Sequence, residues 1–161
     1  PVHTRNGEER EVECMELLSK ATGHEFVNIG DDQVHIHSNE VGCTPDGVVL
    51  DELDLVKTGA EAKCKSPLEH AKLWLIDNND ELKENAFDHF VQVQTQMLVT
   101  ETDHWYFCIY NPFAVDWMRF KFIIIKRDDA FIKILKQRIE LAKQIKAEFL
   151  QQFKPELQNA A

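Results

Sequence analysis

The chain has 161 residues, of which 43% are hydrophobic and 29% are charged, a length and composition typical of one compact globular domain. No apolar run approaches the roughly 20 residues that cross a bilayer, and no signal peptide is visible, so we expect an intracellular protein without membrane attachment. The formal net charge of −10 argues against a generally basic DNA-binding surface, because such surfaces neutralise phosphates with Lys and Arg. An acidic chain can still act on DNA where bound divalent cations and a local basic lining supply the positive charge.

The first part of the chain predicts one helix and then a series of short strands. The helix covers residues 8–22, with an approximate apolar stripe and with Gly23 at its expected stop. The segments that follow are two short β-like stretches within 25–37 around a turn at 30–32, a turn and strand at 41–50, a polar connection at 51–57 and a strand at 59–65.

The second part predicts helices that enclose two further strands. The segments are a helix at 68–77, a break at 78–80, a longer helix at about 84–99, strands at 105–110 and 119–125, and a last helix from the cap at 128–129 to about 153. This order predicts a single α/β domain over residues 1–161, in which helices flank a central mixed sheet.

Cysteine and histidine spacing indicates no structural metal site. The four cysteines include no CxxC pair, and we expect small buried side chains rather than zinc ligands or disulfides. His35 and His37 alternate and would share one face of a strand. We expect a surface pair, because nothing nearby completes a ligand set.

The candidate site is formed by Asp46, after Pro45 at one strand entry, and by Glu61 and Lys63 on the following strand. Residues two apart on a strand share a face, so Glu61 and Lys63 project together while Ala62 points towards the core. If the two strands pair as a hairpin, Asp46 lies close to Glu61. Two converging carboxylates suit Mg²⁺, and a lysine beside the metal can hold or deprotonate the attacking water. The alternative is an exposed strand face with two surface carboxylates and a lysine, an everyday arrangement.

Four motifs in order surround these residues. They are GCTPDG at 42–47, EAKC at 61–64, QVQTQMLVT at 92–100 and WYF at 105–107. Together they resemble the lambda-type phage exonucleases, also called alkaline or viral recombination exonucleases, of the PD-(D/E)xK nuclease superfamily. Upstream, Gly7 followed by Glu11 is similar to the family's G-x-x-x-E helix, and the resemblance covers about residues 5–125.

The resemblance implies a restriction-endonuclease-like core and Mg²⁺-dependent, processive 5′→3′ digestion of one strand of double-stranded DNA, with Mn²⁺ as a substitute metal. It also implies a homotrimeric ring around the DNA, a partner single-strand annealing protein, and a place in the cytoplasm of a bacterium or a phage-infected cell. Family members carry a further N-terminal segment with an arginine that holds the DNA 5′-phosphate. Because nothing precedes Pro1, we expect either a fragment or a minimal variant without that segment.

The resemblance also assigns roles by matching position. Asp46, Glu61 and Glu11 would be metal-site carboxylates, the backbone carbonyl of Ala62 a further metal ligand, and Lys63 the catalytic lysine.

Two glutamines extend the candidate site onto the helix at about 84–99. Gln92 matches the family's glutamine beside the active site and would join the catalytic residues. Gln96 is four residues later on the same helix face, and we expect it, with Lys65, to contact the substrate. The alternative is that both belong to a polar outer face. His89 stands where the family has a tyrosine, three residues before Gln92.

With so acidic a chain, we expect DNA to contact a restricted basic lining. The candidates are Lys63 and Lys65 at the site and Lys72 on the helix that follows.

The sequence thus favours a metal-dependent DNA nuclease, a 5′→3′ exonuclease of phage-type recombination or DNA end resection. A nicking or structure-specific endonuclease with the same site is the nearest alternative. The others are a non-catalytic DNA-processing subunit that has kept the fold and an α/β binding domain with chance matches.

Overall fold

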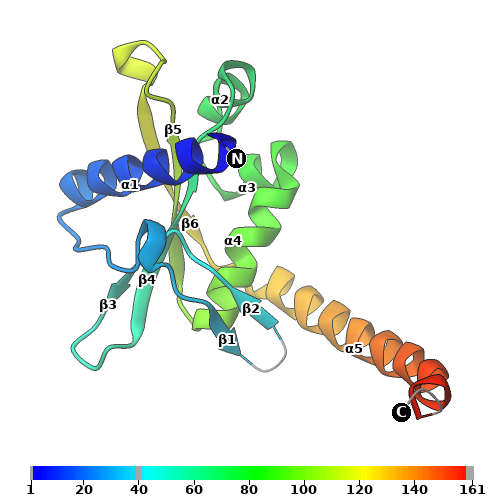
Figure 1. Cartoon of the computed structure of the whole chain (residues 1–161). Coiled ribbons are helices and arrows are strands. Elements are labelled where there is room, and N and C mark those ends of the chain that lie inside the picture. The colour runs from blue at the N-terminus through cyan, green and yellow to red at the C-terminus, as the bar shows by residue number, and fades with distance from the viewer. Residues whose placement is uncertain (1, 39–40, 159–161) are drawn as a thin grey trace. The chain divides into compact units, whose positions relative to one another are not determined.

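The protein is described by a computed structural model, which covers the backbone of residues 2–38 and 41–158 and the side chains of 9–38 and 41–152. It falls into two compact units, Pro1–Arg127 and Asp128–Ala161, which are described separately. In chain order the elements are α1 (Val2–Thr22), the 3₁₀ turn η1 (Gly30–Asp32), β1 (Ile36–Ser38), β2 (Val41–Cys43), β3 (Gly47–Leu50), β4 (Val56–Lys63), α2 (Pro67–Trp74), α3 (Asn79–Asn85), α4 (Phe87–Thr100), β5 (His104–Tyr110), the 3₁₀ turn η2 (Asp116–Met118), β6 (Phe120–Lys126) and α5 (Asp129–Gln158) (Figure 1).

A four-stranded mixed sheet in the order β3-β4-β5-β6 forms the centre of the first unit. β4 and β5 run parallel, whereas β3 and β6 are antiparallel to their neighbours. A parallel pair needs a long crossover, and α2, α3 and α4 supply it. β1 and β2 form a separate antiparallel hairpin. The predicted mixed sheet flanked by helices is therefore confirmed.

The two faces of the sheet are covered by different helices (Figure 1). On one face, α1 contributes Cys14, Met15 and Leu18 to a core that also contains Ala60 and Ala62 of β4. Because strand side chains alternate, Glu61 and its register partner Phe107 point to the other face. That face is covered by α4, whose buried apolar residues are Phe90, Val93, Met97 and Val99.

Several boundaries differ from those predicted from the sequence: α1 begins at Val2 rather than at residue 8, the predicted segment 41–50 divides into β2 and β3, and β4 begins at Val56, inside the predicted polar connection. The break predicted at residues 78–80 lies slightly earlier, at residues 75–78, and Asn78 caps α3 by accepting a hydrogen bond from the Glu81 N–H at 3.0 Å. The helix predicted at about 84–99 is α4, and α3 is an additional short helix before it. Between residues 25 and 37, one of the two predicted β-like stretches is only a bridge between Val27 and Val48. η1 forms the turn after it.

The cysteines and the histidine pair agree with their predicted places. Cys14 and Cys108 are buried, Cys43 and Cys64 are partly buried, and all four are free. The exposed rings of His35 and His37 lie 4.2 Å apart.

The second unit is the long helix α5, which begins where the sequence places its cap. The Asp128 Oδ1 atom accepts a hydrogen bond from the Phe131 N–H at 2.9 Å. The helix continues to Gln158, beyond the predicted end near residue 153. Across the part of the chain that the structure describes, no helix is both long and apolar enough to traverse a membrane.

Gly59 provides a test of the sheet packing. A Cβ atom at this position would collide with the indole ring of Trp105, which is fully buried. We expect Gly59→Ala to lower the free energy of unfolding by about 3 kcal/mol, measured by chemical denaturation. The control is Gly23→Ala, where the added Cβ meets nothing within 4 Å and the cost comes from a φ of 72° alone. An equal loss of unfolding free energy in both variants would contradict the close contact between Gly59 and Trp105.

Candidate nuclease site

The β3–β4 hairpin positions Asp46 directly before β3. The Asp46 N–H donates to the Ala60 carbonyl at 3.2 Å, which continues the ladder between the two strands. The Asp46 Oδ2 atom accepts a hydrogen bond from the Ala62 N–H at 2.7 Å, and Oδ1 accepts one from Gln33 Nε2 at 3.2 Å. The predicted hairpin therefore forms, and it brings Asp46 beside the strand that carries Glu61.

Glu61 is a buried carboxylate, with only 3% of the residue exposed. Its Oε1 atom accepts hydrogen bonds from Lys63 Nζ at 2.5 Å and from Gln92 Nε2 at 2.7 Å. Its Oε2 atom accepts one from Gln96 Nε2 at 2.6 Å. The alternative of an exposed strand face is therefore wrong. Three donors compensate for the loss of hydration that burial imposes on this charge.

Lys63 lies between Glu61 and α4. Its Nζ atom forms an ion pair with Glu61 and donates a hydrogen bond to Gln92 Oε1 at 3.0 Å, and its side chain is 11% exposed. Gln92 thus contacts both catalytic candidates of β4, and Gln96 is buried against Glu61. The alternative in which the two glutamines lie on a polar outer face is wrong.

The electrostatic environment of Asp46 disfavours its negative charge. Burial raises the pKa of Asp46 to about 7, and the negative charges of Glu61 and Glu11 act in the same direction. The hydrogen bond from the Ala62 N–H and the positive charge of Lys63 oppose this shift. A divalent cation is the counter-charge that such a pair of carboxylates favours.

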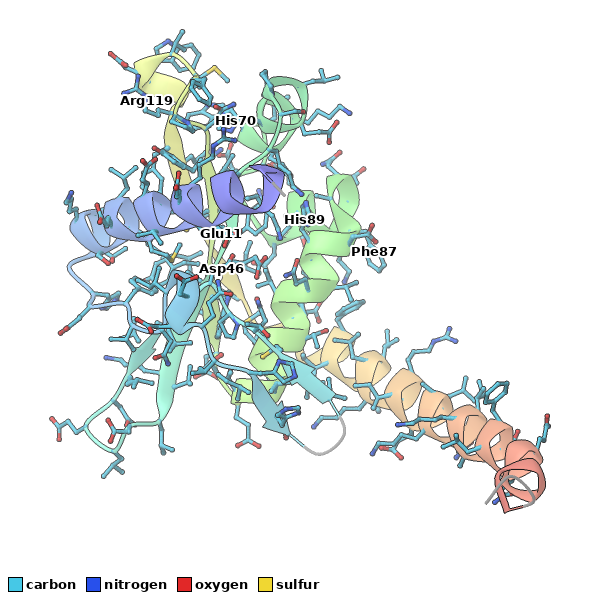
Figure 2. The ribbon with its side chains drawn as sticks, viewed as in Figure 1. Glu11, Asp46, His70, Phe87, His89 and Arg119 are labelled. Atoms are coloured by element: carbon cyan, nitrogen blue, oxygen red, sulfur yellow. The ribbon has the colours of Figure 1, made fainter. Side chains whose placement is uncertain are left out.

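The oxygen donors near Asp46 suit a hard cation. The two carboxylates of Asp46 and Glu61 are held by adjacent strands, and Glu11 of α1 lies close enough for its charge to raise the pKa of Asp46 (Figure 2). Among the residues that the structure describes, no three His, Cys, Asp or Glu side chains are already grouped as a metal-ligand set. The metal roles of Asp46, Glu61, Glu11 and the Ala62 carbonyl remain predictions. Hard oxygen donors match Mg²⁺, which keeps several waters in its coordination shell.

The predicted basic lining is found only in part. Lys63 is in the site, and Lys65 is exposed two residues later on the chain. Burial lowers the pKa of His89 to about 4, and the positive charges of Lys63 and Lys65 act in the same direction. Lys72 instead pairs with Glu69 at 2.8 Å on the surface of α2.

Two contacts of the Asp46 segment were not predicted from the sequence. Gln33, from the loop before β1, donates to the Asp46 carboxylate. The His35 Nδ1 atom lies 2.8 Å from the Thr44 Oγ1 atom and holds the chain two residues before Asp46. The hydrophobic pattern carries no signal for either contact, because both join side chains of irregular segments.

The mixed sheet, with Asp46, Glu61 and Lys63 gathered on the β3–β4 hairpin, has the arrangement of the PD-(D/E)xK class that the sequence resembles. Residues 3–103 match the YqaJ-like viral recombinase domain, and the chain belongs to this family. No curated protein has a sequence similar enough to count as a match.

Solved structures show the same fold. An alkaline exonuclease from Laribacter hongkongensis, LHK-Exo, superposes with a TM-score of 0.70 at 24% identity, over 92% of this chain and 72% of its own. Its complex with dAMP gives the same values. A phage-related exonuclease from Haemophilus somnus 129PT has a TM-score of 0.68 at 17% identity, over 94% of this chain and 73% of its own.

The raised pKa of Asp46 predicts a stability change that runs opposite to the usual behaviour of a carboxyl. The folded state binds this proton more tightly than the unfolded chain, so stability falls as the pH rises from about 4 through about 7. In chelator at pH 8, we expect Asp46→Asn to stabilise the protein by roughly 1–3 kcal/mol, because the neutral amide removes this cost. At pH 5 the gain should shrink. Thermal unfolding at both pH values measures the difference.

The matched control is Asp31→Asn, because Asp31 is exposed on η1. It should change the unfolding temperature little at either pH. If Asp46→Asn lowered the unfolding temperature at pH 8, the prediction would be wrong, because the ionised Asp46 carboxylate would then stabilise the folded protein without a cation.

Proposed function

We propose that this chain is a metal-dependent DNA nuclease, specifically a 5′→3′ exonuclease that degrades one strand from the ends of double-stranded DNA. The observation that carries the proposal is the buried Glu61 carboxylate, which lies 2.5 Å from Lys63 Nζ on the strand paired with the Asp46 segment. Family membership supports a role in viral recombination, and similar structures are named as exonucleases. Phage-type recombination or DNA end resection is the proposed setting.

In this proposal, Asp46 and Glu61 hold Mg²⁺, with the Ala62 carbonyl and Glu11 as further ligands. When bound, Mg²⁺ supplies Lewis-acid polarisation of the scissile phosphate and lowers the pKa of a coordinated water. The Nζ atom of Lys63 orients the attacking water and offsets negative charge as it develops on the phosphoryl oxygens.

The glutamines of α4 keep these groups in position. Gln92 contacts both Lys63 and Glu61, and Gln96 fixes the second oxygen of Glu61 from a buried position. Their contribution is preorganisation, since a carboxylate held by three donors has little freedom to turn away from a cation.

The proposal extends to assembly and location. From the resemblance to the lambda-type exonucleases, we include a homotrimeric ring around the DNA, a single-strand annealing partner and a cytoplasmic site of action. Sedimentation of the protein, and a challenge with unlabelled competitor DNA during digestion, address the ring. A monomer that digests distributively would remove the ring from the proposal and leave the chemistry intact.

The direct test of the reaction compares linear and covalently closed circular duplex DNA, with either strand end labelled. We expect digestion of the linear DNA from its 5′ ends and none of the closed circle. Cleavage of the circle would replace the exonuclease by an endonuclease with the same site. Absence of cleavage of both, at every metal concentration, would refute the nuclease.

Metal substitution should separate binding from chemistry. Because the donors are hard oxygens, Mg²⁺ and Mn²⁺ should support digestion, excess chelator should abolish it, and Ca²⁺ should bind without supporting turnover. Calorimetric titration of each metal and a gel assay of digestion give the two readouts. Full activity in excess chelator would exclude the metal mechanism.

Lys63 should act on the reaction more than on the metal. We expect Lys63→Ala to lower kcat by about 10²–10⁴-fold, because the positive charge beside the scissile phosphate is lost, while Mg²⁺ affinity is retained. Lys57→Ala is the matched control, since Lys57 is exposed near the start of the same strand. Near-normal turnover by a folded Lys63→Ala protein would refute the role of this lysine.

A further inference from the structure

The β1–β2 hairpin carries two exposed histidines on one of its faces (Figure 1). His37 lies in β1 and His35 directly before it, so both alternate with Ile36 and project on the same side. The centroids of the two rings lie 4.2 Å apart. Neither imidazole has a part in the chemistry proposed for Asp46, Glu61 and Lys63. The pair is therefore a candidate for a separate role.

Gly42 leaves open a place that both rings approach. It is the register partner of His37 on β2. The point that a Cβ atom of Gly42 would occupy lies 2.5 Å from His35 Nε2 and 3.0 Å from His37 Nδ1. One ring nitrogen of each histidine is thus close to the same point. Because Zn–N bonds to histidine measure about 2.0–2.1 Å, small rotations of the two exposed rings would bring both nitrogens within bonding distance of one ion.

The other nitrogen of His35 is already held by a neighbouring hydroxyl. His35 Nδ1 lies 2.8 Å from Thr44 Oγ1. When a metal ion takes the lone pair of Nε2, the ring proton resides on Nδ1, which then donates to the Thr44 hydroxyl. Histidine ligands are commonly oriented by such a hydrogen bond from their second nitrogen. Thr44 is therefore a positioning residue for His35.

The two imidazole nitrogens determine which ions the pair can bind. Imidazole suits Zn²⁺, Cu²⁺ and Ni²⁺, whereas Mg²⁺ and Ca²⁺ prefer oxygen ligands. Within the part of the chain that the structure describes, no third His, Cys, Asp or Glu completes a ligand set, so water must fill the remaining coordination positions. The net charge of −10 attracts cations to the surface on which the pair lies.

We infer that His35 and His37 form a binding site for a divalent transition-metal ion of the Zn²⁺ type, separate from the proposed Mg²⁺ site. The ion is bound by His35 Nε2 and His37 Nδ1, with water as its other ligands. Its binding fixes the hydrogen bond from His35 to Thr44 and so restrains the segment that leads to Asp46. The inference goes beyond the proposed nuclease function and does not depend on it, because metal binding by the pair requires no DNA.

The test is a calorimetric titration of the whole chain with Zn²⁺ in excess Mg²⁺, which keeps sites of oxygen ligands occupied. Loss of an outer partner of a ligand typically lowers metal affinity by about 10–100-fold, and loss of the ligand itself should lower it at least as much. We therefore expect His35→Ala and His37→Ala each to weaken Zn²⁺ binding by about tenfold or more. Electron paramagnetic resonance of bound Cu²⁺ should show coupling to two nitrogens, and to one fewer in His37→Ala.

His104→Ala is the matched control, because His104 is a partly exposed histidine on β5 whose ring contacts Tyr106. It should keep the Zn²⁺ affinity of the unmodified protein. Gly42→Ala adds a second test, since it retains both histidines but places a methyl group at the point that their nitrogens share. This variant should also bind Zn²⁺ more weakly. Thr44→Val should lower the affinity by about tenfold, because the orienting hydrogen bond of His35 is lost.

The outcomes for the histidine pair and for the nuclease are distinct. Absence of Zn²⁺ binding by the unmodified protein would overturn the site. An affinity unchanged in His35→Ala or in His37→Ala would also overturn it, because the ion would then bind elsewhere, and so would an affinity unchanged in Gly42→Ala. A protein that binds Zn²⁺ through the pair but digests no DNA would refute the proposed function and support this site.

Discussion

The burial of the Glu61 carboxylate constrains the rest of the structure. A charged group inside a protein is costly unless it is well hydrogen-bonded, and Glu61 accepts from Lys63, Gln92 and Gln96. Two of these donors belong to α4. Their hydrogen bonds fix both the position of α4 along β4 and the rotation of the helix about its own axis. A shift of the helix by one residue would remove both glutamine donors and leave the Glu61 carboxylate with Lys63 alone among its three donors. The site and the helix–sheet packing are therefore one arrangement.

β4 serves both faces of the sheet. Ala60 and Ala62 pack against α1 in the core, while Glu61 and Lys63 point to α4. Small side chains at the alanine positions let α1 lie close to the strand, which is also how Glu11 comes near Asp46. The concentration of negative charge disfavours the ionised form of Asp46. This cost agrees with the cation site proposed above, because functional sites are often built at the expense of stability.

Part of the site could be predicted because it depends on local geometry. Alternation along a strand put Glu61 and Lys63 on one side and Ala62 on the other, and a hairpin with a short loop brought Asp46 to the adjacent strand. Helical spacing put Gln92 and Gln96 on one face. The α3 cap at Asn78 was missed, because Asn favours turns and helix caps alike and only the Glu81 N–H distinguishes them. The Gln33 contact joins a loop to a strand entry, which no periodic pattern encodes.

The sequence by itself determined the fold class, the order of most elements and which residues are candidates for the site, because hydrophobic periodicity and residue type are properties of neighbouring positions. The tertiary structure decided which charges are buried. The sequence left open whether Glu61 lies on an exposed strand and whether the glutamines lie on an outer helix face. Both questions depend on the packing of α4 against β4, which are far apart in the chain. Gln92 and Glu61, which this packing joins by a hydrogen bond, are separated by 31 residues. The same packing places His89 beside a cavity, and burial there lowers the pKa of His89.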